Sequence, residues 1–180
     1  MDSNPELRVL LSHEEIGAMV GRIAAEIKRE YQGKYPLLVG ILKGSFVFLA
    51  DLVRHLDFPM EVEFIRLASY GRGRSTPGEL KVVHNLVTRV RDRDVLVIED
   101  IVDTGHTTKF ILDYLRGQKP ASLRLCALTN KPSRRQVPVE IDYLGFTIPN
   151  KFIVGYGIDW DERFRNLPDI CFVEVAENDV

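Results

Sequence analysis

Short apolar segments that alternate with amphipathic ones constrain the fold of this chain more than any other feature. Four of them are PLLVGIL (36–42), DVLVIED (94–100), SLRLCALTN (122–130) and FIVGYGI (152–158). Segments of this length, rich in branched residues, are typical of strands buried on both faces of a sheet. Because segments with helical spacing alternate with them, the sequence predicts an α/β fold with an open, mostly parallel sheet flanked by helices.

Apolar residues recur at helical spacing in three segments. The first begins at a capping box, Ser12 with Glu15, and is expected to form a helix that continues to Tyr31. The other two cover residues 44–56 and 107–116. Each has one apolar face, which is expected to pack on the sheet.

Two further segments alternate apolar and polar residues, as half-buried strands do. They are MEVEFIRLASY (60–70) and LKVVHNLV (80–87), and the loop GRGRSTPGE between them is rich in Gly, Pro and Ser. The pattern predicts a long hairpin arm whose two strands are joined by a polar loop.

Composition indicates a single globular domain, residues 1–180, because 180 residues with 45% hydrophobic content can bury a sizeable core. Lys and Arg number 24 against 26 Asp and Glu, which gives a net charge of -2. A chain without a basic excess is not expected to bind nucleic acid nonspecifically. We therefore expect no nucleic-acid partner.

The segment MDSNPELRVLLSHEE (1–15) has no apolar run long enough for a signal peptide or a membrane span. The sequence therefore predicts a soluble, cytoplasmic protein with no membrane partner. Cys126 and Cys171 both lie in apolar segments and lack metal-ligand spacing. This setting favours reduced thiols in the core over reactive or bridged cysteines.

The segment VLVIEDIVDTGHTT (95–108) carries the densest chemistry of the chain. It begins in a predicted buried strand, and ligands of open α/β sheets bind beyond the carboxyl ends of the strands. Its glycine-hydroxyl run leads into a predicted helix, where unpaired backbone N–H groups and the helix dipole favour a phosphate. The spacing fits neither a Walker A loop nor the GxGxxG of dinucleotide folds.

Three acids accompany that loop, namely Glu99, Asp100 and Asp103. Carboxylates beside a phosphate are favourable where the ligand also carries hydroxyl groups, a bound cation or a centre that becomes positive during reaction. A phosphorylated ribose with a leaving group on its anomeric carbon has all three features. An acidic turn that only caps the helix would account for Asp103 or Thr104, but it leaves the other two acids unexplained.

The same segment resembles the phosphoribosyl pyrophosphate (PRPP) motif of type I phosphoribosyltransferases. Within that superfamily the chain is similar to the hypoxanthine-guanine phosphoribosyltransferase family over nearly all its length. The narrower resemblance depends on GILKGSFVFLADL, RLASYGRGRSTPGE, LTNKP and NKFIVGYGIDWDERFRNLP, which occur in that order. It implies the type I phosphoribosyltransferase fold, with a small hood region and a mobile flap. The implied activity is transfer of the 5-phosphoribosyl group from PRPP to N9 of hypoxanthine or guanine in purine salvage, giving IMP or GMP and pyrophosphate.

The resemblance implies roles for the residues of the PRPP motif. Glu99 and Asp100 would hold the ribose hydroxyls, and Asp103 would be the general acid/base at purine N7. His106 is expected to contribute its backbone N–H rather than its imidazole. The implied 5'-phosphate loop comprises Thr104, Gly105, His106, Thr107 and Thr108.

A second implied loop, LKGS, would bind pyrophosphate through Lys43 and Gly44, with Arg165 as a further contact. In the family, a non-proline cis peptide at the position of Leu42–Lys43 turns a backbone N–H toward the leaving group. Gly44 would allow close approach of the backbone to an anion. From the sequence alone, Lys43 is equally well read as a solvated lysine at the start of a helix.

The remaining implied residues concern the purine and the flap. Lys131 would donate to the 6-oxo group, and Phe152 would stack on the base, although KFIVGYG alone favours a core position for this ring. Trp160 is expected near the base pocket. The other implied purine contacts are Ile153, through its backbone, and Asp159. The implied flap covers residues 69–78 and begins with the pair Ser69 and Tyr70.

The implied cofactor is Mg²⁺, with Glu99, Asp100 and Asp159 as its candidate ligands. Together with Lys43 and Arg165 it would stabilise the departing pyrophosphate, while the carboxylates face an oxocarbenium-like sugar. The resemblance also implies a homodimer or homotetramer, formed through the segment DLVRHLDFPMEVEF (51–64) and the pyrophosphate loop.

Two other functions fit the sequence less well. An RNA-binding regulator on the same fold would need a basic face, which the net charge of -2 and the purine-site residues Lys131, Phe152 and Asp159 argue against. A pyrimidine acceptor has no N7 for Asp103. A preference for xanthine stays open, because it depends on contacts at the purine 2-position.

Overall fold

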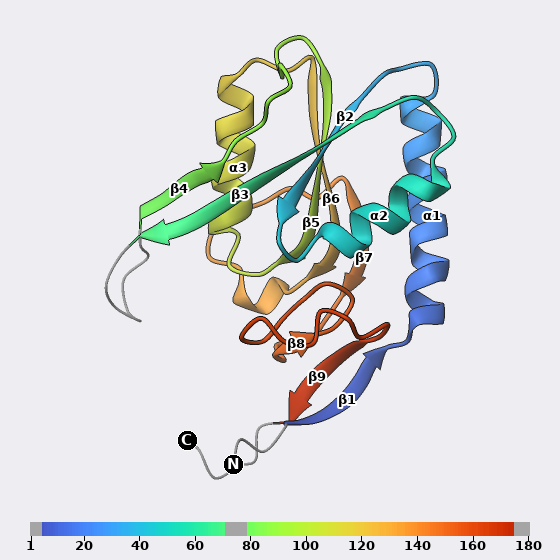
Figure 1. The fold of residues 1–180 in the computed structure, drawn as a ribbon, viewed down its shortest axis with the longest axis vertical. Coiled ribbons are helices and arrows are strands. Elements are labelled where there is room, and N and C mark those ends of the chain that lie inside the picture. Colours follow the sequence, from blue (N-terminus) through green and yellow to red (C-terminus); the bar gives the residue numbers. More distant parts are fainter. Residues whose placement is uncertain (1–4, 71–78, 175–180) are drawn as a thin grey trace.

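The computed structural model describes residues 5–70 and 79–174. Within these ranges the chain forms a six-stranded sheet, a three-stranded sheet and three α-helices (Figure 1). The expected flap at 69–78 falls mostly outside the described residues, as do the side chains of Ser69 and Tyr70. The role of the flap therefore stays a prediction.

The larger sheet confirms the expected open, mostly parallel architecture. Its strand order is β4-β3-β2-β5-β6-β7, and each neighbouring pair is parallel except β3 with β4. The antiparallel pair is the hairpin arm that the alternating segments predicted. The strands are β2 (Leu37–Leu42), β3 (Glu61–Tyr70), β4 (Glu79–His84), β5 (Asp94–Val102), β6 (Ser122–Asn130) and β7 (Tyr143–Thr147).

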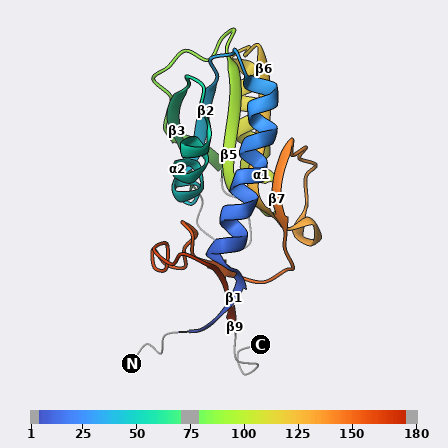
Figure 2. The same cartoon turned by 90° about the vertical axis from the view of Figure 1, so that its right-hand side faces the viewer.

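The three helices are α1 (His13–Tyr31), α2 (Phe46–His55) and α3 (His106–Gly117). The capping box at the start of α1 is present: Ser12 accepts from the backbone N–H of Glu15, and the Glu15 carboxylate accepts from the N–H of Ser12. Residues of α1 and α2 share one core cluster, and residues of α3 belong to another. The helices therefore cover opposite faces of the sheet, giving three layers (Figures 1 and 2).

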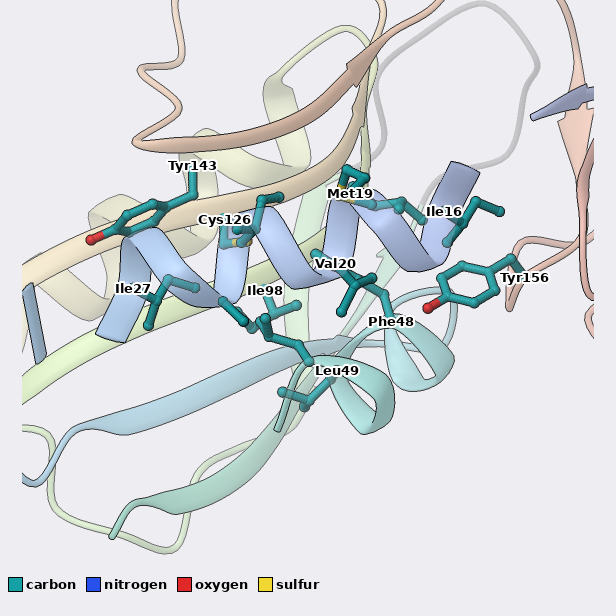
Figure 3. Packing of buried hydrophobic residues seen from close by; sticks show 14 of the residues in the cluster. Ile16, Met19, Val20, Ile27, Phe48, Leu49, Ile98, Cys126, Tyr143 and Tyr156 are labelled. Atoms are coloured by element: carbon teal, nitrogen blue, oxygen red, sulfur yellow. The ribbon is translucent and has the colours of Figure 1, made fainter. Parts of the chain in front are cut away.

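The central strand β5 shows why its sequence is apolar at successive positions. Leu96 and Ile98 pack with α1 and α2, and Ile98 points toward α1 in Figure 3. Val95 and Val97 point to the other face and pack with α3. All four side chains are fully buried. A strand with helices on both faces has no solvent-facing side, so period-two alternation disappears.

The smaller sheet joins the two ends of the described chain. Its order is β1-β9-β8, with both pairs antiparallel, and it lies below the larger sheet in Figure 1. The strands are β1 (Glu6–Leu11), β8 (Ile153–Val154) and β9 (Ile170–Glu174). Next to β9, the Asp169 carboxylate accepts from the backbone N–H of His13 at 2.7 Å, which fastens this sheet to the start of α1. This three-stranded sheet is the hood that the family resemblance implied.

The prediction for FIVGYGI was wrong in part. Only Ile153–Val154 is a strand, and it belongs to the smaller sheet. Gly155 and Gly157 have φ of +99° and +95°, and Tyr156 between them has φ of +49°, so the chain turns where an extended strand would continue. The edge position beside β6 is taken by β7. The apolar and alternating sequence patterns did not predict β7, β1 or β9.

Cys126 and Cys171 are both buried and free, as expected for core thiols. Burial raises the pKa of each thiol, most strongly that of Cys126, and so disfavours the reactive thiolate. Among the described residues no helix is both long and apolar enough to cross a lipid bilayer.

Candidate active site

Three segments far apart in the sequence meet at the carboxyl ends of β2 and β5. A Cβ built on Gly44, just after β2, would lie 1.8 Å from Oδ2 of Asp100 near the end of β5. A Cβ built on Gly157 would lie 2.4 Å from the carbonyl oxygen of Gly44. A side chain at position 157 would therefore meet backbone, and one at position 44 would displace the Asp100 carboxylate. The 43–45 loop lies between the acids of β5 and the 155–158 turn.

Glu99 and Asp100 are the acids at this junction. Glu99 is 5% exposed, and its Oε2 accepts a hydrogen bond from Oγ1 of Thr108 at 3.3 Å. Asp100 is half-buried, and its backbone carbonyl accepts from Oγ1 of Thr129 on β6 at 2.9 Å. The pair is thus fixed by hydroxyl groups from α3 and β6.

Burial raises the pKa of Glu99 well above its usual range, and the charge of Asp100 adds to the effect. Burial also raises the pKa of Asp100, against the opposing attraction of Arg165. Two adjacent carboxylates in a poorly hydrated place are costly when both are ionised. This position therefore favours a ligand that brings hydroxyl donors or positive charge.

The loop between β5 and α3 has the form of an anion site. Gly105 precedes α3 with φ of +91°, and a Cβ there would lie 2.8 Å from the carbonyl oxygen of Val137. The first backbone N–H groups of a helix have no partner within the helix, so those of His106 and Thr107 are available to an anion. Thr107 is exposed, whereas Thr108 is buried and donates to Glu99.

The segment after β6 braces this loop from outside. The carbonyl oxygen of Thr104 accepts from the backbone N–H groups of Gln136 and Val137, at 2.9 and 3.2 Å. The ring Nε2 of His106 lies 3.0 Å from Oε1 of Gln136. The imidazole is therefore occupied at the loop's outer side, which agrees with a backbone role for His106.

Asp103 is surrounded by cations from the end of β6 and the following turn. Nε of Arg134 donates to its Oδ1 at 2.8 Å, and Nε of Arg135 donates to its backbone carbonyl at 3.1 Å. Lys131 is 6% exposed, and its backbone N–H donates to the carbonyl of Val102 at 3.0 Å. Burial lowers the pKa of Lys131, and the charge of Asp103 works against that shift.

The 43–45 loop contains the non-proline cis peptide at Leu42–Lys43 that the family resemblance implied. After it, the buried hydroxyl of Ser45 donates to the carbonyl of Ile41 at 2.7 Å, which closes the loop onto the end of β2. Lys43 itself is 41% exposed and points to the 159–165 segment, where Nζ donates to both carboxylate oxygens of Glu162 at 2.8 Å.

Arg165 lies against the same carboxylate. Its guanidinium pairs with Oδ1 of Asp159 at 2.8 Å and with Oε2 of Glu162 at 3.2 Å, and it donates to the carbonyl of Gly157 at 2.8 Å. Glu162 therefore joins Lys43 and Arg165, the two cations that the resemblance assigned to pyrophosphate. The Nε of Arg165 is buried and has no hydrogen-bond partner among residues 5–70 and 79–174.

The aromatic residues expected at the base are exposed rather than buried in the core. Phe152 is 51% exposed and Trp160 is 37% exposed, and their rings meet edge to face with centroids 6.0 Å apart. Trp160 also stacks on Phe164 at 6.5 Å. Ile153, the next residue in the sequence after Phe152, is buried, with 3% of its surface exposed. An open aromatic face of this kind suits stacking on a planar ligand.

Sequence reasoning missed Arg134, Arg135 and Glu162. Weak signals were present: two adjacent arginines lie shortly after Lys131, and two acids, Asp161 and Glu162, lie between Asp159 and Arg165. Neither signal states which group each side chain would contact.

The candidate Mg²⁺ ligands are not gathered into one cage. Across residues 5–70 and 79–174, no group of three or more His, Cys, Asp or Glu lies close enough to hold a metal by itself. Asp159 pairs with Arg165, apart from the adjacent acids Glu99 and Asp100. This donor set fits Mg²⁺ that takes most of its oxygen ligands from water and substrate phosphates, as is usual for this ion.

Comparisons with known proteins agree with this geometry. The sequence model of the phosphoribosyl transferase domain family matches residues 8–161. The hypoxanthine-guanine phosphoribosyltransferase of Bacillus subtilis is 43% identical, over 94% of both chains, and that of Aquifex aeolicus is 45% identical, over 94% of this chain and 96% of its own. A crystal structure of a hypoxanthine-guanine phosphoribosyltransferase from Bacillus anthracis superposes with a TM-score of 0.89, at 40% identity, over 95% of this chain and all of that one. The chain therefore belongs to the phosphoribosyltransferases, and within them to the hypoxanthine-guanine phosphoribosyltransferase family.

Proposed function

We propose that this protein transfers the 5-phosphoribosyl group of PRPP to N9 of hypoxanthine or guanine, releasing pyrophosphate and forming IMP or GMP. The observation that carries the proposal is the position of Lys131. It is a buried lysine whose backbone is hydrogen-bonded to the end of β5, next to Asp103 and the phosphate-type loop. A buried ammonium beside a carboxylate is a suitable pair of contacts for the O6 and N7 edge of a 6-oxopurine.

The electrostatics of the site match the charges that form during this transfer. Breaking the anomeric C–O bond leaves positive charge on the ribose and negative charge on pyrophosphate. Glu99 and Asp100 hold the ribose hydroxyls and stabilise the positive sugar. Lys43 and Arg165 bind the departing pyrophosphate, and the buried, unpartnered Nε of Arg165 is a donor that a phosphate oxygen would satisfy.

The 5'-phosphate binds at the start of α3, with backbone N–H groups and the helix dipole as the main attraction. Thr104, Gly105, His106 and Thr107 line this subsite, and Thr108 supports it indirectly through Glu99. A bound Mg²⁺, with Glu99, Asp100 and Asp159 as its proposed contacts, supplies charge neutralisation on the phosphate oxygens.

At the acceptor end, the purine stacks on Phe152, and the backbone of Ile153 meets its edge. Its N9 attacks the anomeric carbon while Asp103 takes the N7 proton, so that the base does not become cationic. Lys131 donates to the 6-oxygen. The same ammonium would be repelled by a 6-amino group, which has donors of its own.

The activity itself is the first test. Purified protein with PRPP, Mg²⁺ and hypoxanthine or guanine is expected to form IMP or GMP and one equivalent of pyrophosphate, measured by chromatography and a pyrophosphate assay. Excess EDTA is expected to abolish turnover, and added Mg²⁺ to restore it. Full turnover in EDTA, or no product with either base, would contradict the proposal. Xanthine as a third base determines the order of preference.

Asp103→Asn tests proton transfer. If Asp103 only capped the loop, the amide would be nearly silent, because Asn caps about as well as Asp. As acceptor of the N7 proton, Asp103 contributes a basicity that the amide lacks, so kcat is expected to fall about 10-fold or more. Steady-state kinetics should show a smaller change in KM for PRPP. Asp113→Asn, on the exposed side of α3, is the matched control, and wild-type kcat in Asp103→Asn rules out the assignment.

Lys131→Met tests base selectivity while keeping the buried stem apolar. Loss of a charged donor to the 6-oxygen is expected to lower kcat/KM for hypoxanthine about 10- to 100-fold. Discrimination against adenine should weaken at the same time, because the repelling ammonium is gone. Lys109→Met removes an exposed lysine as control. A variant that still uses hypoxanthine normally and still rejects adenine would show that Lys131 has another role.

We also propose a homodimer or homotetramer formed through α2, the start of β3 and the pyrophosphate loop. Phe46 and Val62 are 42% and 43% exposed there. A largely apolar cavity of about 640 Å³ lies between α1, α2 and the 165–168 segment, with Phe46, Leu167 and Pro168 among its lining residues. Exposed apolar surface of this kind is typical of a protein interface.

Sedimentation at micromolar concentration is expected to give at least twice the monomer mass. Phe46→Glu places a charge in the proposed interface and should shift the protein toward monomer, whereas Val87→Glu, at a 91% exposed position, should not. A fully active wild-type monomer at this concentration would refute the assembly.

We further propose that residues 1–180 act as one domain in the cytoplasm, where the free cysteines stay reduced. Fractionation of cells would test the location.

A further inference from the structure

Arg134 contacts the proposed acid/base residue directly, and the purine chemistry described so far makes no use of it. Its Nε donates to Oδ1 of Asp103 at 2.8 Å, and both side chains are partly exposed. Arg134 ends the short 3₁₀ turn Pro132–Arg134, and its backbone N–H donates to the carbonyl of Lys131 at 3.1 Å. The turn therefore fixes Arg134 relative to both Lys131 and Asp103.

The neighbouring Arg135 performs a different task. Its guanidinium donates to the backbone carbonyls of Asp103 and Val102, both at 3.1 Å, and to the side chain of Asn130. It thus fixes the backbone of the loop. Arg134 alone of these two contacts the carboxylate, and it does so through one oxygen.

We propose that Arg134 is a positioning residue for the transfer: it holds Oδ1 of Asp103 and so directs Oδ2 toward N7 of the bound purine. The inference rests on the proposed role of Asp103. A carboxylate that turns freely would present its proton-accepting oxygen in a productive direction only part of the time. A single charge-assisted hydrogen bond from a residue anchored next to Lys131 removes that freedom.

Arg134 also places a positive charge beside two groups whose charge states matter. The cations facing Asp103 are Arg134 on the 3₁₀ turn, Lys131 at the end of β6 and Arg135 beyond it, while Glu99 and Asp100 of β5 and the imidazole of His106 lie on its own segment. Burial lowers the pKa of Lys131, and Arg134 pushes it in the same direction. The guanidinium therefore disfavours the charged form of Lys131.

Loss of the Arg134 charge is expected to move the alkaline limb of the pH profile. Activity at high pH requires Lys131 to be protonated, and the positive charge of Arg134 lowers the pKa of Lys131. Removing that charge makes protonation of Lys131 easier, so the alkaline limb should move to higher pH. A merely structural role of Arg134 would lower the height of the profile without moving this limb.

The experiment compares Arg134→Gln, Arg134→Lys and the control Arg116→Gln, which removes another exposed arginine paired with an aspartate, on α3. For Arg134→Gln, kcat with hypoxanthine is expected to fall about 3- to 10-fold with little change in KM for PRPP. The alkaline limb of kcat/KM against pH should move to higher pH, because Lys131 loses a neighbouring positive charge. Ionisations of the substrates are common to all variants and cancel in the comparison.

Arg134→Lys keeps the charge but not the planar donor, so it is expected to restore the alkaline limb while leaving kcat partly reduced. In an Asp103→Asn background, Arg134→Gln should cause no further loss of kcat at the pH optimum, because the effect on kcat passes through Asp103. Wild-type kcat with a wild-type alkaline limb in Arg134→Gln overturns the inference, as does a loss of kcat that is just as large in the Asp103→Asn background. If Asp103→Asn is itself fully active, the proposed function of Asp103 fails instead.

Discussion

The contact between the Gly44 backbone and the Asp100 carboxylate is the constraint on which the rest of the site depends. Any side chain at position 44 would overlap Asp100, and any at position 157 would overlap Gly44. The Asp100 carboxylate, the backbone of Gly44 and the backbone of Gly157 are therefore stacked at the ends of β2 and β5. Helices cover both faces of these central strands and so hold the stack in place. The position of the 43–45 loop between the Asp100 carboxylate and the 155–158 turn is thus set by close packing.

Charge in the site is arranged in alternating zones around that stack. The acidic pair Glu99 and Asp100 occupies the centre. Lys43 and Arg165 lie to one side, joined by Glu162, and Lys131 and Arg134 lie to the other, beside Asp103. A substrate that is anionic at its leaving group, becomes positive at its sugar and is neutral at its acceptor meets the matching environment at each zone. The arrangement places cations where the proposed polyanionic donor would bind, although the net charge of the chain is only -2.

The sequence predicted much of this because its signals were local. Unbroken apolar runs revealed the central strands, and the capping box marked the start of α1. The same reasoning failed for residues 152–158, where apolar content indicated a strand but the positive φ of two glycines makes a turn. It also could not reveal the partners of Lys43 and Asp103. Glu162 is 119 residues from Lys43, and Arg134 is 31 residues from Asp103, so periodicity carries no information about either contact.

The pairing of β1 with β9 has a consequence for the order in which the protein assembles during synthesis. The larger sheet is complete once residue 147 is available, whereas the smaller sheet needs Ile170–Glu174 to pair with Glu6–Leu11. Contacts between such distant segments form late, because a long loop must close first. The edge formed by the 43–45 loop, the acids of β5 and the start of α3 is therefore built before the segment that carries Phe152 and Arg165 is held in place. In a nascent chain the proposed contacts from the larger sheet form first, and the proposed contacts from Phe152 and Arg165 are added only when the last strand docks.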